Sequence, residues 1–279
     1  MIEVLNAGFY TTIQDYGRFH YTQYGIPLSG AMDRRLFRLS NLLLDNDEKI
    51  PAIEMIYVGA KLKFTEQTTV CITSPKAEVK LNGISVELNK QLRLNRNDEI
   101  SVRQIESFAY LAVKNGFSSE KKLNSYSQYK TITKKSKLEK GDKLYYSPNV
   151  NSTLKNANIK FDNSYYNSSE IDVFVLPEYS CLNEFQKKRL NMDFTLSPKS
   201  NRMAFQLNEI IENQMNGISS KPVMPGTVQL TPEGSLIILM RDAQVTGGYP
   251  RIFQLTEDSI NRLAQKKLNS KIKFKINKI

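Results

Sequence analysis

The chain has 279 residues, which corresponds to about two domains at roughly 150 residues each, or to one large β domain. With 40% hydrophobic and 24% charged residues, 13 glycines and 10 prolines, the composition excludes disordered and collagen-like proteins. The only cysteines, Cys71 and Cys181, and the single histidine, His20, exclude a disulfide framework, a four-ligand zinc site and Ser-His catalysis within this chain alone.

The sequence lacks the signals of a membrane or exported protein. No window approaches the ~18 to 20 consecutive apolar residues of a spanning helix, and the densest apolar run, 236–240, has the length of a strand. The N-terminus carries Glu3 and has neither the basic start nor the long apolar run of an export signal. We therefore expect a cytoplasmic protein that does not enter a membrane.

Most of the chain alternates short strand-like runs with turn residues, which is typical of an all-β sandwich or barrel. Asn82-Gly83 lies between two alternating runs and is a strong hairpin signal. We expect strands at 69–73, 78–81, 85–88, 99–102, 108–113 and 235–240. The predicted fold class is mainly β with a few helices.

Helical periodicity occurs in three places. The first helix is expected at about 32–45, with Asp33 near its positive end. The second is expected to begin at Ser180 as cap and to carry Leu182, Phe185 and Leu190, and the third to begin at Thr256 as cap. The Asn- and Ser-rich segment 149–170 predicts a loop between two halves. We therefore place an N-terminal domain at 1–150, containing the helix at about 32–45, and a C-terminal domain at 151–279.

The net charge of +11 comes mainly from two segments. Residues 118–143 hold eight lysines against three acidic residues, and residues 262–278 hold seven basic residues and no acidic one. Because lysines alternate with apolar residues over 271–276, we interpret them as the solvated face of a half-buried strand, with protection of a sheet edge as a second use. A patch for an anionic ligand or partner is the alternative. No nucleic-acid motif accompanies these segments, so no nucleic-acid partner is expected.

Two glycine-bearing segments could carry chemistry. Residues 12–18 and 25–33 place glycines, acids and Arg18 where a helix begins, an arrangement that can present backbone N–H groups and an arginine to an anion. The alternative is a structural loop in which Asp15 pairs with Arg18. Residues 241–250 follow an apolar strand and include Gly247-Gly248, which fits either a site loop or an ordinary hairpin turn. No P-loop or Gly-x-Gly-x-x-Gly motif occurs.

Some single residues remain ambiguous from the sequence. Glu54 lies in an apolar stretch, where it could be a general acid or base or pair with Arg18 or Arg202. Arg202 is similarly an anion clamp or a buried partner. We expect His20 to be a packing residue, and both cysteines to belong to the core.

Six ordered blocks resemble the biotin-dependent carboxyltransferase family. They are Gln14–Arg18, Gly25–Asp33, Asn41–Leu43, Tyr110–Val113, Pro225–Gln229 and Asp242–Pro250. This family includes the C subunit of bacterial ATP-dependent 5-oxoprolinase, the second-subunit type of allophanate hydrolase and an antagonist of a histidine-kinase inhibitor. The resemblance implies two cyclophilin-like β-barrel domains that work with partner proteins.

The resemblance implies hydrolysis of 5-oxo-L-proline to L-glutamate with ATP cleavage, together with a kinase-inhibitor-like B subunit and a lactam-utilisation A subunit. ATP would be shared with the partner, no metal site is assigned to this chain, and biotin is not expected because no biotin-carrier Met-Lys-Met motif is present. The alternatives are a non-catalytic protein that binds a kinase-inhibitor-like partner, and the carboxyltransferase part of urea or allophanate metabolism.

Under this interpretation, residues from both glycine-bearing segments meet around one small anionic substrate. The catalytic residues are predicted to be Asp15, Arg18, Arg202 and Asp242. The substrate-binding residues are predicted to be Gln14, Gly17, Ser29, Gly30, Asp33, Gln229, Thr246, Gly247, Gly248 and Tyr249.

The chain departs from the family pattern at three points. Relatives usually carry Gly-Ser-Arg-Ser-Thr where this chain has 124–128 (Asn-Ser-Tyr-Ser-Gln), and Gly-Gly where it has Asn115-Gly116. After Arg202-Met203, two glycines and a second arginine of the family pattern are replaced over 204–209. These changes remove two arginines and favour a substrate other than 5-oxoproline or the non-catalytic alternative.

Overall fold

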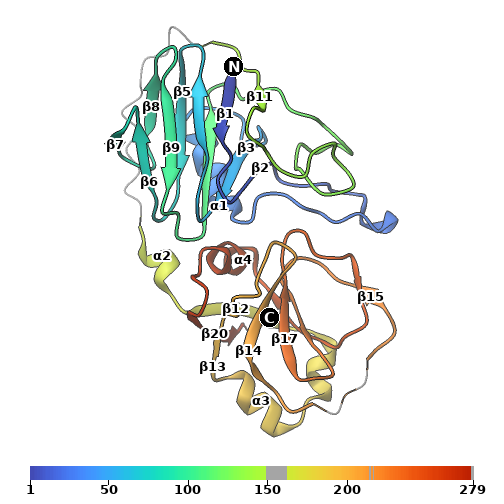
Figure 1. Cartoon of the computed structure of the whole chain (residues 1–279). Coiled ribbons are helices and arrows are strands. Elements are labelled where there is room, and N and C mark those ends of the chain that lie inside the picture. The colour runs from blue at the N-terminus through green and yellow to red at the C-terminus, as the bar shows by residue number, and fades with distance from the viewer. Residues whose placement is uncertain (149–161, 214, 216, 278–279) are drawn as a thin grey trace. The chain divides into compact units, whose positions relative to one another are not determined.

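The structure is a computed structural model that describes residues 1–148, 162–213, 215 and 217–277 (Figure 1). The chain divides into two compact units, Met1–Arg18 with Ser29–Asn163 and Phe19–Leu28 with Ser164–Ile279. The predicted boundary at 150/151 and the first part of the predicted loop at 149–170 lie outside the described residues. Within the part of the chain that is described, no helix is both long and apolar enough to cross a membrane.

The first unit is built from two antiparallel sheets (Figure 1). One sheet has the order β11 (Lys143–Leu144), β1 (Ile2–Asn6), β4 (Lys61–Phe64), β9 (Glu99–Arg103), β6 (Glu78–Leu81), β7 (Ile84–Val86). The other has the order β2 (Tyr10–Gln14), β3 (Ala52–Ile56), β10 (Phe108–Val113), β5 (Thr68–Thr73), β8 (Gln91–Leu94). The strands predicted between residues 69 and 113 are all present, although β7 ends at Val86 rather than at residue 88.

The predicted hairpin at Asn82-Gly83 is confirmed. It joins β6 to β7 with Leu81 opposite Ile84. Asn82 and Gly83 have φ values of 50° and 86°, and two successive residues with positive φ are what the tight turn between twisted strands requires.

Apolar side chains from both sheets of the first unit form one core. Val4 and Leu62 come from the six-stranded sheet, and Ile53, Val70 and Leu111 come from the five-stranded sheet. Every residue of β10 is buried, because α1 (Arg34–Leu42) packs on β10, β5 and β3. The core and α1 therefore enclose β10 and β3.

Asp33 determines where α1 begins. Its side chain accepts hydrogen bonds from the backbone N–H groups of Arg35 and Leu36, which have no partner within the helix. The helix predicted at about 32–45 is thus observed over a shorter range. Its start brings residues 29–33 against the five-stranded sheet, where they meet Glu54 and Tyr110.

The second unit is a seven-stranded sheet that nearly closes into a barrel. Its order is β13 (Asp193–Thr195), β20 (Lys271–Ile276), β12 (Glu170–Val175), β19 (Arg251–Leu255), β16 (Thr227–Leu230), β17 (Ser235–Leu239), β14 (Ala204–Ile210). The two outermost strands, β13 and β14, contact each other, and a bridge joins Leu196 to Leu207. β15 (Lys221–Pro222) and β18 (Thr246–Gly247) form a separate two-stranded ribbon. The mainly β fold class predicted from the sequence is confirmed.

Of the two helix caps predicted in the second unit, one is confirmed and the other is corrected. Thr256 caps α4 (Glu257–Ala264) as predicted, because its side chain accepts from the Ser259 N–H. The cap of α3 (Glu184–Leu190) is Asn183 rather than Ser180. Ser180 lies instead in the 3-10 helix η2 (Pro177–Cys181), and Phe185 lies on α3 with 68% exposure. The described part of this unit also contains two short helices, η1 (Thr22–Tyr24) and α2 (Ser164–Asn167).

The physical reason for this difference is a reciprocal cap. The Asn183 side chain accepts from the Gln186 N–H at 2.8 Å, and the Gln186 side chain accepts from the Asn183 N–H at 2.9 Å. Two unpaired backbone donors are thereby satisfied at once, which a cap at Ser180 would not do.

The lysine-rich strand β20 has the predicted alternation. Lys271, Lys273 and Lys275 are exposed, whereas Ile272 and Phe274 are buried. The suggested protection of a sheet edge is wrong, because β20 lies between β13 and β12. Lys275 pairs with Glu170 of the neighbouring strand at 3.1 Å.

Replacing the cap of α3 tests the assignment of its start. We expect Asn183→Ala to lower the free energy of unfolding by about 1 kcal/mol, because the Gln186 N–H loses its acceptor. Ser180→Ala should cost clearly less, since Ser180 does not cap the helix. Urea unfolding followed by circular dichroism measures both variants, and a larger effect of Ser180→Ala would contradict this cap.

Candidate functional site

The carboxylate of Asp15 is the centre of a buried hydrogen-bond cluster in the first unit. Its Oδ1 accepts from the Gly17 N–H at 2.8 Å, the Ser125 hydroxyl at 2.7 Å and the Ser127 hydroxyl at 2.6 Å. Its Oδ2 accepts from the Tyr126 N–H at 2.7 Å. Asp15 is only 6% exposed, so these four donors replace the water that its charge would otherwise need.

Arg18 lies at the same cluster and is fully buried. Its guanidinium donates from Nη2 to the backbone carbonyl of Ser127, the residue whose hydroxyl binds Asp15. The segment 125–127 therefore holds both the aspartate and the arginine of the first glycine-bearing turn. Ser125 and Ser127 were not singled out in the sequence, although they lie in the segment where the chain departs from its family pattern.

The two halves of the first turn are joined through their backbones. The Ala31 N–H donates to the Asp15 carbonyl at 2.8 Å. Gly30 has a φ of 96°, and a Cβ on it would lie 2.8 Å from the Tyr16 carbonyl group. Glycine is therefore required at position 30 both for its backbone conformation and for the close approach of the chain.

Beyond Gly30, the chain meets a buried carboxylate and a buried phenol. Glu54 Oε2 accepts from the Met32 N–H and from the Tyr110 hydroxyl, both at 2.8 Å, and Tyr110 in turn accepts from the Asp33 N–H at 2.8 Å. Burial, followed by the negative charges of Glu54 and Asp33, raises the pKa of Tyr110 well above its usual value. Tyr110 therefore stays protonated and acts as a donor to Glu54.

Two predicted substrate-binding residues in this unit have spare hydrogen-bonding capacity. Gln14 and Ser29 are fully buried, and within the described ranges neither Gln14 Oε1 nor Ser29 Oγ has a hydrogen-bond partner. Buried polar atoms are normally paired, so these two atoms are suited to a polar group that the described chain does not supply. The amide nitrogen of Gln14 donates to the Thr12 hydroxyl at 3.0 Å.

In the second unit, Arg202 and Asp242 form a buried ion pair. Nε of Arg202 lies 2.7 Å from Oδ2 of Asp242, and Nη2 lies 3.0 Å from Oδ1, so the pairing is bidentate. Both residues are 6% exposed, and the Asp242 N–H also donates to the Arg202 carbonyl at 2.9 Å. This geometry fixes the base of the second glycine-bearing turn, and the role of Arg202 towards an anion stays a prediction.

The second turn itself lies against Gln229 of β16. A Cβ on Gly247 would lie 2.4 Å from the Gln229 amide nitrogen, which also approaches the Tyr249 carbonyl at 3.4 Å. Gln229 is buried, whereas the side chains of Thr246 and Tyr249 are exposed. The predicted residues 229 and 246–249 are thus brought together, with polar side chains on their exposed side.

A second ion-pair cluster supports this turn and was missed in the sequence. Glu178, at 7% exposure, binds Arg251 through two contacts of 3.1 and 3.2 Å and binds Lys221 at 2.8 Å. Burial raises the pKa of Glu178, but the hydrogen bonds from Arg251 and Lys221 outweigh burial and lower the pKa to about 2. No sequence pattern links these three residues, because each belongs to a different element of the second unit.

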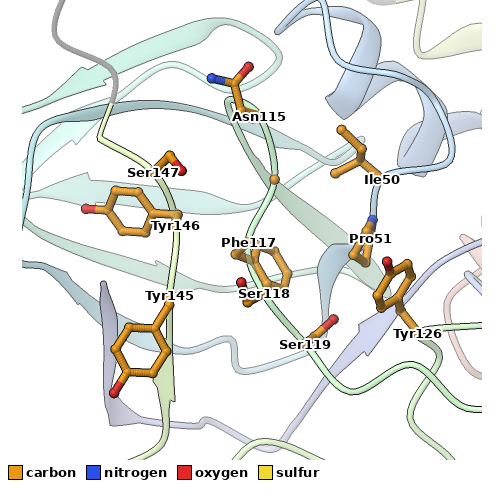
Figure 2. Close-up of a pocket in the computed structure, with 11 residues that line it drawn as sticks. Ile50, Pro51, Asn115, Phe117, Ser118, Ser119, Tyr126, Tyr145, Tyr146 and Ser147 are labelled. Carbon is orange, nitrogen blue, oxygen red and sulfur yellow. The ribbon is translucent and has the colours of Figure 1, made fainter.

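A cavity of about 530 Å³ lies elsewhere in the first unit. Figure 2 shows residues 115–119 running between Ile50, Pro51 and Tyr126 on one side and residues 145–147 on the other. The polar side chains that line it carry hydroxyls and one amide, without a charged group. None of the predicted site residues lines this cavity, although Tyr126 connects it to Asp15 through its backbone N–H.

Other expectations are corrected by the structure. His20 is exposed, with a φ of 71°, so its assignment as a packing residue is wrong. Cys181 is also exposed at the end of η2, whereas Cys71 is buried and burial raises its pKa to about 12. Among the described residues, no group of three or more His, Cys, Asp or Glu side chains is placed to hold a metal ion. The joining of the two glycine-bearing turns into one site stays a prediction.

Removing the charge of Asp15 tests its role as the centre of the first cluster. In Asp15→Asn, an amide nitrogen replaces one of the two carboxylate oxygens that now accept hydrogen bonds, so a donor faces donors. We therefore expect the free energy of unfolding to fall by about 2 to 3 kcal/mol. Asp47→Asn, at an exposed position of the same unit, should change it by less than about 0.5 kcal/mol. Equal effects of the two substitutions in urea unfolding would rule out this role.

Because the pKa of Glu178 is lowered from 4.5 to about 2, its ion pairs should stabilise the fold fully above pH 4.5. That stabilisation should be lost as the pH falls from 4.5 towards 2. The measurement is the difference in unfolding free energy between the wild type and Glu178→Gln, taken from about pH 3 to about pH 7. We expect the difference to be constant near neutral pH and to shrink below about pH 4.5. A difference that grows on acidification would contradict the assignment.

Comparison with known proteins places this geometry in a family. Residues 24–276 match the family described as carboxyltransferase domain, subdomain A and B. The chain is 32% identical to the C subunit of 5-oxoprolinase from Haemophilus influenzae and 29% identical to that from Escherichia coli, and each alignment covers 98% of this chain and 90% of the relative. Urea amidolyase of Lachancea kluyveri is 38% identical over 46% of this chain and 7% of its own length.

Solved structures show the same fold at lower identity. The crystal structure of TTHA0988 superposes with a TM-score of 0.86 at 21% identity, and that of K. lactis urea amidolyase with a TM-score of 0.84 at 23% identity. Both cover 98% of this chain, which spans 55% of the first protein and 18% of the second. From the family match over most of its length and the full-length relatives, we conclude that the chain belongs to the carboxyltransferase domain family with subdomains A and B.

Proposed function

We propose that the chain is the C subunit of an ATP-dependent 5-oxoprolinase, which helps hydrolyse 5-oxo-L-proline to L-glutamate with ATP cleavage. The observation that carries this proposal is the near full-length similarity to two proteins named as C subunits of 5-oxoprolinase. In sequence, the urea amidolyase relatives match less than half of the chain, and the solved urea amidolyase structure that covers 98% of it is only 23% identical. A carboxyltransferase role in urea metabolism is therefore the weaker alternative.

The chemistry of the reaction requires groups that stabilise negative charge. A five-membered lactam is resonance-stabilised, so opening it requires activation of its carbonyl, and charge develops on the carbonyl oxygen. Arg18, Arg202 and the backbone N–H group of Gly248 are the donors that we assign to this charge, whereas the Gly247 N–H faces Lys221 in the ribbon of β15 and β18. Asp15 and Asp242 are each engaged by hydrogen bonds from the chain. We therefore assign Asp15 to positioning the first turn and Asp242 to positioning Arg202.

The remaining polar residues of the two turns are assigned to substrate binding. Gln14 and Ser29 each offer a buried oxygen without a partner in the described ranges, which supports contact with a polar substrate group. Gly17, Gly30 and Asp33 shape the first turn. The second turn contributes Gln229, Thr246 and Tyr249.

ATP binding is assigned to the complex rather than to this chain alone. The sequence has no P-loop, and the described residues include no cluster of three or more carboxylate, imidazole or thiol groups that could hold the metal of a metal-nucleotide. These residues do not fit a complete nucleotide site, so we assign the nucleotide to a site that a partner shares or supplies. The partners in this proposal are a kinase-inhibitor-like B subunit and a lactam-utilisation A subunit.

The test is reconstitution of the complex from co-purified subunits. We expect glutamate and ADP to be released from 5-oxoproline and ATP only when this chain is present. Release that is unaffected by omitting the chain would reject the enzymatic role and would favour the non-catalytic binding alternative.

A variant of Arg18 tests the assigned donor. In the assembled complex, Arg18→Met should lower kcat for 5-oxoproline by about 100-fold or more, because one donor to the developing charge is lost. Arg38→Met removes an exposed arginine of α1 that pairs with Glu48, and it should leave kcat unchanged. Thermal unfolding shows whether each variant is folded; a folded Arg18→Met variant with wild-type turnover would remove Arg18 from the site.

A further inference from the structure

The second glycine-bearing turn is held by a ribbon that is not part of the barrel sheet. In this ribbon Gly247 of β18 lies opposite Lys221 of β15, and Thr246 lies opposite Pro222. Two further backbone hydrogen bonds extend it, from the Val223 N–H to the Val245 carbonyl and from the Ile218 N–H to the Gly248 carbonyl. An isolated two-stranded ribbon is marginally stable, so the turn depends on whatever fastens β15 to the barrel.

Glu178 and Arg251 provide that attachment. Arg251 begins the barrel strand β19 and donates from Nη1 to the Pro222 carbonyl at 3.2 Å. Its Nε and Nη2 bind the two carboxylate oxygens of Glu178 at 3.2 and 3.1 Å. The Nζ of Lys221 binds the same carboxylate at 2.8 Å. One buried carboxylate thus connects η2, β19 and the strand that pairs with Gly247.

We infer that Glu178 is a positioning residue for substrate binding: through Arg251 and Lys221 it fixes the backbone of residues 246–249 in the geometry that presents the Gly248 N–H group. This inference rests on the proposed function, which assigns that group to the substrate. Lys221 and Pro222 are both held by the Glu178–Arg251 pair, and they are the residues that pair with the turn.

The side chain of Gln229 is a weaker attachment for the turn. It contacts Gly247 and the Tyr249 carbonyl from the barrel strand β16, but its hydrogen bond to that carbonyl is long, at 3.4 Å. Lys221 is the most exposed member of the Glu178 cluster, with 46% side-chain exposure, whereas Glu178 and Arg251 are at 9% and 18%. The Glu178–Arg251 pair, shielded from water, is therefore the stronger part of the attachment.

The experiment compares Glu178→Gln with Glu184→Gln in the assembled complex. Glu184 is an exposed acid of α3 in the same unit, paired with Lys187 at 3.0 Å, so it is a matched control for the change in charge. Hydrogen–deuterium exchange of the peptide covering residues 244–249 is measured together with the kinetics for 5-oxoproline. We expect Glu178→Gln to raise exchange at 244–249 at least 10-fold, to raise KM about 10-fold and to change kcat less, while Glu184→Gln changes none of these.

Each result decides the inference. Unchanged exchange at 244–249 in folded Glu178→Gln overturns it. Raised exchange with unchanged KM overturns the link to substrate, and it locates the failure in the proposed site rather than in the attachment of the turn. If Glu178→Gln fails to fold, Lys221→Met serves instead, because its side chain is half exposed, and a smaller rise in exchange and KM is expected. An absence of any rise in that variant also overturns the inference.

Discussion

The hydrogen bonds to the Asp15 carboxylate are the interaction on which the first half of the candidate site depends. A buried carboxylate is costly to desolvate, and here four donors from two distant segments compensate for that cost. The same contacts bring residues 125–127 next to Gly17 and Arg18. Because both carboxylate oxygens are engaged, the aspartate organises the turn, and Arg18 is the charged group of that turn with the chemistry to meet an anion.

The second unit uses the same principle with ion pairs. Asp242 holds Arg202 in a bidentate contact, and Glu178 holds Arg251 and Lys221. In each case an acidic side chain fixes a basic one at the base or side of the turn that contains Gly247. Each glycine-bearing turn is therefore a short irregular segment made rigid by buried charge, which is what a preorganised anion site requires.

The helix starts illustrate how far local sequence rules reach. Thr256 was identifiable because a capping side chain and an apolar stripe follow each other directly in the chain, whereas Asp33 was expected inside the first turn of its helix and is instead the cap. At α3 the same rules favoured Ser180, whereas the structure uses Asn183, because a glutamine three residues later completes a reciprocal cap. His20 and Cys181 show what residue type alone does not determine. An imidazole ring or a thiol can be buried or exposed, and the sequence around these two residues does not distinguish the two cases.

Sequence patterns were sufficient to predict the mainly β architecture, the hairpin at Asn82-Gly83, the start of α4 and the family, because periodicity, turn chemistry and ordered motifs are local properties of the chain. Only the folded structure reveals that Ser125 and Ser127 bind Asp15, that Tyr110 donates to Glu54, and that Glu178 joins Arg251 to Lys221. These contacts join residues many positions apart. Their formation depends on strand order and register, which local sequence patterns do not encode.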